Sequence, residues 1–156
     1  MSQVIEQRIG SLLGNFGLLP FFALAVASWI PFADAPARVV LIALVGYAAV
    51  ILSFLGAVHW GMTLLTPQLT KSQAWNTLGW GVVPSLLGWL ALLLAAGGMR
   101  PWVVIVFLLG DLLLCRLMDG ALWRLYPSVP GWYLPLRTRL TAGAMIALTI
   151  ALFAHL

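Results

Sequence analysis

Five long apolar runs constrain what this chain can fold into more than any other feature of its sequence. Each run approaches or exceeds the roughly 20 helical residues needed to cross about 30 Å of hydrocarbon. The breaks between them are short and carry turn residues such as proline and glycine. The sequence therefore predicts an all-α integral membrane protein, a five-transmembrane-helix bundle that forms a single membrane domain over residues 1–156. The predicted spans lie at about 11–30, 39–65, 76–96, 102–122 and 138–155.

The composition also indicates that lipid surrounds most of the chain. Hydrophobic residues make up 63% of the chain and charged residues 8%, whereas soluble proteins are about half apolar and a quarter charged. The net charge of +4 comes from eight scattered Lys and Arg residues, of which Arg137 and Arg139 are the nearest to a cluster. This scatter argues against a nucleic-acid partner. The single cysteine, Cys115, allows neither an internal disulfide nor a Cys-rich metal site within these residues.

The positive charges predict an orientation, because Lys and Arg accumulate in cytoplasmic loops. With a cytoplasmic N-terminus, the opposite side receives only Arg38 and Arg100. The cytoplasmic side then receives Arg8, Lys71, Arg124, Arg137 and Arg139, with Arg116 near the same end of the fourth span. We therefore predict that the N-terminus is cytoplasmic and the C-terminus is outside.

Aromatic residues gather near the predicted helix ends. Trp and Tyr side chains at these positions are typical of the interfacial belts of a membrane protein. Stacking on a ligand is the alternative for some of them. The residues concerned are Trp29, Trp75, Trp102, Trp123, Tyr126, Trp132 and Tyr133.

Small residues predict where the helices pack, because close approach drives helix association in lipid. Gly46, Ala49, Ser53 and Gly56 recur every three or four residues along one face of the second span. Gly81, Ser85 and Gly88 repeat this spacing in the third span, where Pro84 predicts a kink. We call such a row of small residues a seam. The seam of the second span turns His59 toward protein and continues into Trp60. We expect the opposite side to face lipid, through Leu44, Ile51, Phe54, Leu55 and Val58.

The fourth span carries a polar stripe. Asp111, Cys115, Asp119 and Trp123 stand four residues apart, so they follow one helix face. Arg116, three residues before Asp119, is close enough to reach it. The other side carries Leu113, Leu114, Leu117 and Ala121, which suit lipid. The stripe is therefore predicted to face inward.

These patterns predict a polar cluster of His59, Asp111, Arg116 and Asp119 inside the bundle. His59, Arg116 and Asp119 fall at similar depths, and Asp111 lies nearer the midplane. An intramembrane acid points to function by default. Three structural alternatives remain: Arg116 and Asp119 pair and reach the headgroups, His59 is a packed core residue, or Asp111 is purely structural.

Two stretches carry a resemblance to a known family. "YAAVILSFLGAVHWG" (47–61) and "GWYLPLRTRLT" (131–141) resemble the transmembrane protein 69 family, small membrane proteins of bacteria and mitochondria with a domain of unknown function. The resemblance implies a multi-pass protein, here of the bacterial inner membrane, without implying a reaction. It places Arg137 so that it faces either the cluster or an anionic lipid headgroup. The residues that match the family pattern are Ser53, Gly56, His59, Trp60, Gly61, Trp132, Tyr133, Leu136 and Arg137.

Three classes of function are open. In the first, the cluster binds a hydrophobic ligand such as a quinone, a porphyrin or a lipid, or relays protons, with Trp60, Trp132, Tyr133 and Arg137 contributing to the site. In the second, the chain is an accessory or assembly subunit of a larger membrane complex, or forms a homo-oligomer. An enzyme is the least supported class, because no nucleophile, phosphate loop or metal motif is present in the sequence. The sequence predicts no metal site and names no cofactor.

Overall fold

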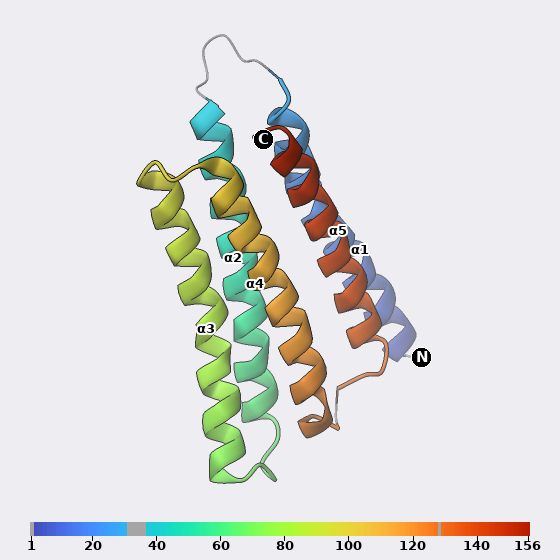
Figure 1. Cartoon of the computed structure of the whole chain (residues 1–156). Helices are drawn as coiled ribbons and strands as arrows, with labels where there is room; N and C mark the ends of the chain where they lie inside the picture. The colour runs from blue at the N-terminus through green and yellow to red at the C-terminus, as the bar shows by residue number, and fades with distance from the viewer. Residues whose placement is uncertain (1, 31–36, 128) are drawn as a thin grey trace.

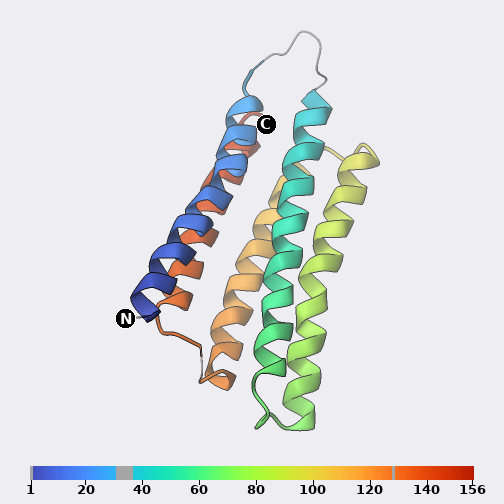
Figure 2. The same cartoon turned by 180° about the vertical axis from the view of Figure 1, so that it is seen from behind.

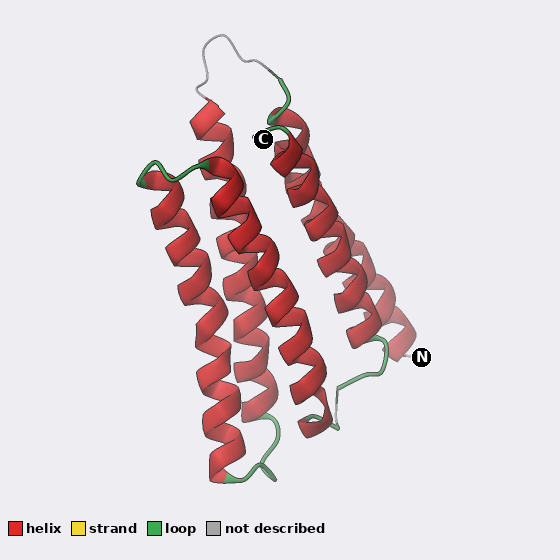
Figure 3. Cartoon of the chain, in the orientation of Figure 1, coloured by secondary structure: helices red, strands yellow, loops and turns green. Residues whose placement is uncertain are grey.

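The computed structural model describes residues 2–30, 37–127 and 129–156, and these residues fold as long helices (Figure 1). The described residues contain no strand (Figure 3). Within this described part of the chain, five helices are long and apolar enough to cross a membrane, which confirms the predicted fold class. The helices are α1 (Ser2–Ala27), α2 (Ala37–Leu64), α3 (Lys71–Ala96), α4 (Pro101–Leu122) and α5 (Tyr133–Phe153), and a short 3-10 helix, η1 (Trp123–Leu125), follows α4.

Several helices extend beyond the spans that hydropathy predicts. α1 begins at Ser2 rather than near residue 11, and α5 begins at Tyr133 rather than near residue 138. The added turns carry polar residues, including Arg8 and Arg137. A helix satisfies its own backbone groups in any solvent, so it continues where the apolar run has ended. Hydropathy therefore marks only the apolar part of each helix.

Local sequence explains where α3 and α4 begin. Thr70 and Gln73 form a capping box at the start of α3, in which Thr70 Oγ1 accepts from the Gln73 amide and Gln73 Oε1 accepts from the Thr70 amide. Pro101 opens α4 at a position where its missing N–H costs nothing. Between these helices, Gly98 adopts a positive φ of 85°, which glycine tolerates without steric cost.

The helices form two groups that contact each other through two helix pairs. Figure 1 and Figure 2 show α1 lying beside α5, and α2, α3 and α4 lying together. Contacts of α4 with α5 and of α1 with α2 join the groups. The two termini lie at opposite ends of the bundle (Figure 1).

The burial of α4 confirms its predicted inward stripe. Asp111, Cys115 and Asp119 are all buried. On the opposite side, the large hydrophobic residues Leu113, Leu114 and Leu117 are exposed, as expected for a face that contacts lipid.

The lipid-facing side predicted for α2 is only partly correct. Phe54 is exposed, but Leu44 is completely buried in the core. The reason is that α2 contacts α1, α3 and α4, so helices cover it on more than one side. A helix in the middle of a bundle has no single lipid face. Its small-residue seam shows where one neighbouring helix packs but does not show how many other helices cover it.

Small residues bring α2 and α3 together at two points. A Cβ atom at Gly56 would lie 2.2 Å from the carbonyl oxygen of Gly81, and one at Gly88 would lie 2.9 Å from Cα of Ala49. No side chain fits between the helices at either place. The close approach predicted for Gly56, Gly81 and Gly88 is present in the structure.

Other members of the predicted seams contribute less to this contact. Ser53 is exposed and donates its hydroxyl to the Ala49 carbonyl of its own helix. A Cβ at Gly46 would meet nothing closer than a Leu92 methyl group at 4.0 Å. Ser85 is half-buried. Pro84 is buried, and α3 continues through it without a break.

Candidate functional site

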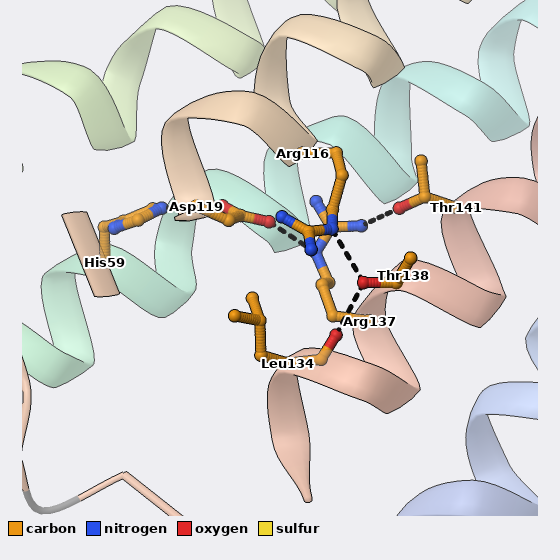
Figure 4. A network of polar contacts seen from close by, with 7 residues as sticks. All are labelled: His59, Arg116, Asp119, Leu134, Arg137, Thr138 and Thr141. Atoms are coloured by element: carbon orange, nitrogen blue, oxygen red, sulfur yellow. Dashed lines mark hydrogen bonds and ion pairs between the residues drawn. The ribbon is translucent and has the colours of Figure 1, made fainter. Parts of the chain in front are cut away.

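Three ionisable side chains from three helices meet inside the bundle (Figure 4). His59 of α2 places Nε2 3.0 Å from Oδ1 of Asp119 on α4. Nε of Arg137, on α5, lies 2.8 Å from Oδ2 of the same carboxylate. The side chains of His59 and Arg137 are each 6% exposed, and that of Asp119 is 10% exposed. We call these three residues the triad.

Each member reaches the others because of its place on its helix. Asp119 occupies the inward stripe of α4, and His59 follows Gly56 by three residues on the buried side of α2. Arg137 stands one turn inside α5, and its Nη1 donates to Thr141 Oγ1 at 2.7 Å, one turn further on. Buried charges need partners of this kind. The guanidinium is therefore fixed both by a carboxylate and by a hydroxyl group.

The triad balances its charges. An ionised Asp119 can only accept hydrogen bonds, so Nε2 of His59 must carry the hydrogen that it donates. The carboxylate offsets the charge of Arg137, which arginine retains in proteins. Nδ1 of His59 and Nη2 of Arg137 are buried and have no hydrogen-bond partner among the described residues. The triad is thus neutral whenever the imidazole is neutral.

A group of hydroxyls lies next to the triad. Thr63 donates to Thr77 Oγ1 at 2.9 Å and lies 3.2 Å from the Tyr126 hydroxyl. The ring of Tyr126 is 6.1 Å from that of His59. Tyr126 was predicted to lie in an interfacial belt, and no sequence pattern indicated Thr63 or Thr77. The available signal was the spacing of Thr63, which stands one turn after His59.

Arg116 does not join Asp119. Its Nε donates to Thr138 Oγ1 at 2.8 Å, and Thr138 in turn donates to the Leu134 carbonyl (Figure 4). Asp119 faces inward between α2 and α5. Arg137 fills the space beside it and supplies the counter-charge. Spacing along one helix therefore predicted the wrong arginine for this carboxylate.

Asp111 stands apart from the triad. It is 4% exposed, its Oδ2 is buried, and it makes no hydrogen bond to any described residue. Eight residues separate it from Asp119, which corresponds to about 12 Å along the helix. The predicted four-residue cluster therefore divides: His59 and Asp119 meet, Arg116 bonds elsewhere, and Asp111 lies deeper in the bundle.

The predicted aromatic residues occupy different places. Trp60 packs against Gly81 and donates Nε1 to the Leu78 carbonyl at 3.1 Å, away from the triad. Tyr133 stacks on Trp123, with centroids 5.3 Å apart and planes 3° from parallel. Trp132 lies over Gly10 of α1, and its buried Nε1 has no partner among the described residues.

A cavity of about 390 Å³ lies between the two helix groups. Its wall is largely apolar. Arg137 and Thr141 bring the polar site to it, so the triad and the cavity share a boundary. The residues lining the cavity are Gly10, Leu13, Gly14, Gly17, Leu18, Phe21, Ile51, Phe54, Leu55, Leu112, Trp132, Tyr133, Leu136, Arg137, Leu140, Thr141 and Ala144.

The site has no arrangement of metal ligands. No group of three His, Cys, Asp or Glu side chains able to hold a metal ion occurs in the described part of the chain. The second histidine, His155, follows the far end of α5, where burial lowers the pKa of its imidazole. The chemistry that the site does provide is a set of fixed hydrogen-bond donors beside an apolar space.

The fold and the site together define a class: a multi-pass helical membrane protein with a buried, charge-balanced triad at the edge of an apolar cavity. The family profile described as "Protein of unknown function (DUF3429)" matches residues 7–153. The chain belongs to this family. The match spans almost all of the described helices, so the family and the membrane domain coincide.

A curated relative agrees with this assignment. Transmembrane protein 69 of Xenopus tropicalis is 36% identical over 138 residues, which cover 83% of this chain and 52% of the relative. The chain thus spans about half the length of the curated relative that it matches. This similarity confirms the resemblance stated from the sequence. No solved structure matches.

Proposed function

We propose that this protein binds a hydrophobic ligand in the cavity between the α1–α5 pair and helices α2 and α4. The observation that carries the proposal is an apolar cavity of about 390 Å³ with the buried cation of Arg137 on its wall. Small-molecule sites are typically mostly apolar spaces of about 300–1,000 Å³ with a few well-placed polar groups. This cavity has both properties.

The position of the cavity suits a ligand that arrives from lipid. Leu13 and Phe54 line the cavity and are 62% and 65% exposed on the outer surface of the bundle. The wall therefore continues onto the surface that contacts the bilayer. A hydrophobic molecule can enter sideways between the helices without crossing a polar surface.

The triad has a positioning role in this proposal. Asp119 and Thr141 hold the guanidinium of Arg137 in one orientation. His59 holds Asp119 from the other side. This residue of the cavity wall is then already ordered, which reduces the entropy lost on binding.

A pair of glycine variants tests the proposal. Gly17 lines the cavity, and a Cβ there would meet nothing closer than the Tyr47 hydroxyl at 3.9 Å, so Gly17→Leu adds bulk without a forced clash at Cβ. Gly110 is exposed, with open space around it, which makes Gly110→Leu the matched control. Small molecules extracted from protein purified in mild detergent are compared by mass spectrometry.

We expect a small molecule to accompany the parent and Gly110→Leu proteins and to be lost from Gly17→Leu. Equal helical circular dichroism of the two variants ensures that folding is not the cause. The proposal is wrong if all three proteins carry the same molecules in the same amounts. Stable protein subunits that co-purify in place of any small molecule would instead favour an accessory role.

A further inference from the structure

We infer that Arg116 binds the phosphate group of an anionic phospholipid on the lipid-facing side of the contact between α4 and α5. The site consists of Arg116, Gly120 and Thr138, and we call it the Arg116 site. None of these three residues lines the cavity. The inference is therefore independent of the proposed function.

Arg116 has no counter-charge among the described residues. Its Nε donates to Thr138 Oγ1 at 2.8 Å, and it forms no ion pair with any described carboxylate. Asp119, one turn away, is already bound to Arg137 and His59. The two arginines thus bring two positive charges against one negative charge, whichever protonation state His59 adopts. At least one positive charge remains, and an anion from outside these residues is needed to balance it.

The outer edge of the Arg116 guanidinium is open to a ligand. Nη1 and Nη2 make no hydrogen bond to a described residue, and they are not buried, in contrast to Nη2 of Arg137. Arg116 itself is half-buried, and Thr138 beside it is exposed. Because Nη1 and Nη2 each carry two N–H donors in one plane, they form a fork that can bind two oxygens of one phosphate group.

Gly120 allows the guanidinium to reach the end of α4. Helical side chains lean toward the N-terminus of their own helix, but Nη1 of Arg116 lies one turn in the other direction. A Cβ at Gly120 would be only 3.2 Å from it. α4 has 22 residues and is about 33 Å long, close to the thickness of the hydrocarbon core. Gly120 is two residues from the last residue of α4, Leu122, so the guanidinium lies at the level of the lipid headgroups.

Charge selects the class of headgroup. A zwitterionic headgroup brings its own cation together with the phosphate, so it leaves the positive charge of the Arg116 site unbalanced. An anionic headgroup such as phosphatidylglycerol brings the phosphate without a cation. Basic pockets between transmembrane helices typically bind anionic headgroups of this kind. The structure therefore favours an anionic over a zwitterionic phospholipid.

The surface beside Arg116 suits a lipid better than a free phosphate ion. Leu113 and Leu117 share a helix face with Arg116 and Gly120, because they stand three or four residues apart. Both leucines are exposed. An acyl chain can lie along them toward the midplane while the phosphate contacts the guanidinium. A free phosphate ion would gain the polar contact alone.

Two lipids with the same acyl chains test the inference. Dioleoylphosphatidylglycerol is anionic and dioleoylphosphatidylcholine is zwitterionic. Their dissociation constants are measured by native mass spectrometry of the full chain in a mild neutral detergent, with one lipid titrated at a time. Such a micelle has no anionic surface, so a protein charge affects binding only where it contacts the lipid. We expect the parent protein to bind phosphatidylglycerol at least about fivefold more tightly than phosphatidylcholine.

Arg116→Gln removes both the charge and the fork. We expect its affinity for phosphatidylglycerol to fall at least about tenfold, which corresponds to losing charge-assisted hydrogen bonds. The preference over phosphatidylcholine should disappear. Arg8→Gln is the control, because Arg8 is exposed at the same end of the bundle but belongs to α1, which packs on α2 and α5 (Figure 1). It should keep the affinity of the parent within about twofold.

Gly120→Leu tests the same site without changing any charge. Its side chain fills the space beside Nη1 of Arg116, and no atom of another helix lies within 4 Å of the Cβ position. We expect the preference for phosphatidylglycerol to be lost as in Arg116→Gln. Gly110→Leu is the matched control on α4, because Gly110 is exposed with open space around it. Equal helical circular dichroism of the two variants excludes misfolding as the cause.

The outcomes separate this site from the cavity and a lipid from a free ion. Loss of the preference in Arg116→Gln and Gly120→Leu, with both controls unchanged, supports the inference. Equal binding of phosphatidylglycerol by the parent and Arg116→Gln contradicts it. If Gly17→Leu loses the lipid instead, the lipid occupies the cavity, so the proposed function stands and this inference is wrong. If inorganic phosphate binds through Arg116 and phosphatidylglycerol does not, the anion is a free ion and the assignment to a lipid is wrong.

Discussion

Nε2 of His59 lies 3.0 Å from Oδ1 of Asp119, although 60 positions separate them in the sequence. The second oxygen of the same carboxylate contacts Arg137, so one side chain of α4 joins α2 to α5. These helices belong to the two groups that flank the cavity. The triad therefore ties the groups together beside the space that we propose a ligand occupies.

Removing one member of the triad should destabilise the protein strongly. Asp119→Leu leaves the buried guanidinium of Arg137 without its counter-charge, and breaking a buried pair in this way costs about 3–5 kcal/mol. The double variant Asp119→Leu/Arg137→Met should recover most of that loss, since no charge then remains unpaired. Unfolding by sodium dodecyl sulfate in mixed micelles, followed by circular dichroism, measures both effects.

Arg139 provides the control for this prediction. It lies on the same helix as Arg137, but it is exposed, and an exposed charge contributes little to stability. We expect Arg139→Met to change the free energy of unfolding by less than about 1 kcal/mol. A loss as large as that of Arg137→Met would mean that the contact with Asp119 is not what makes Arg137 important.

The second intramembrane aspartate should respond in the opposite direction. Asp111 is buried on α4 like Asp119, but it makes no hydrogen bond to any described residue. Asp111→Leu removes an unsatisfied polar group and should raise the free energy of unfolding by about 1–3 kcal/mol. The same detergent titration compares it with Asp119→Leu. Destabilisation by both would show that Asp111 has a partner that stabilises it.

Periodicity within single helices predicted much of this structure. The inward stripe of α4 and the small-residue faces of α2 and α3 follow from spacings of three and four residues, because neighbours on one helix face are fixed by helix geometry. These features depend on the rotation of one helix about its own axis. They could therefore be read before the bundle was known.

Relations between helices were predicted less well. Arg116 was expected near Asp119, yet Arg137 from another helix occupies that place. Leu44 was expected to face lipid, yet it is buried. Both outcomes depend on which helices are neighbours, and apolar side chains facing lipid look the same in sequence as those facing another helix. Before the structure, only the family resemblance indicated Arg137 as a residue of the site.

The contact between α2 and α3 should be intolerant of a single methyl group. Gly56→Ala would place Cβ 2.2 Å from the Gly81 carbonyl oxygen, so the helices must separate, at a cost of about 1–3 kcal/mol. Gly61→Ala is the control on the same helix, because nothing lies within 4 Å of its Cβ position. That variant should be neutral or gain up to about 1 kcal/mol from helix propensity. Equal changes in unfolding free energy for the two variants would contradict the close packing.

The distribution of charge predicts how the bundle is inserted. α2 ends and α3 begins at the end of the bundle where α1 starts (Figure 1). Lys71 and Arg124 mark that end, whereas Arg38 and Arg100 mark the other. Because positive charge favours the cytoplasmic side, we expect the N-terminus to be cytoplasmic and the C-terminus to be outside.

Reporter fusions in a bacterial host measure this orientation. Alkaline phosphatase, which is active only outside the cytoplasm, should be active when fused after Leu156 and inactive when placed in the segment 65–70. A fluorescent protein that matures only in the cytoplasm should give the reciprocal pattern at the same two points, which controls for expression. Phosphatase activity at 65–70 with none after Leu156 would reverse the orientation. It would also place the triad at the outer end of the bundle, because Arg137 stands at the start of α5.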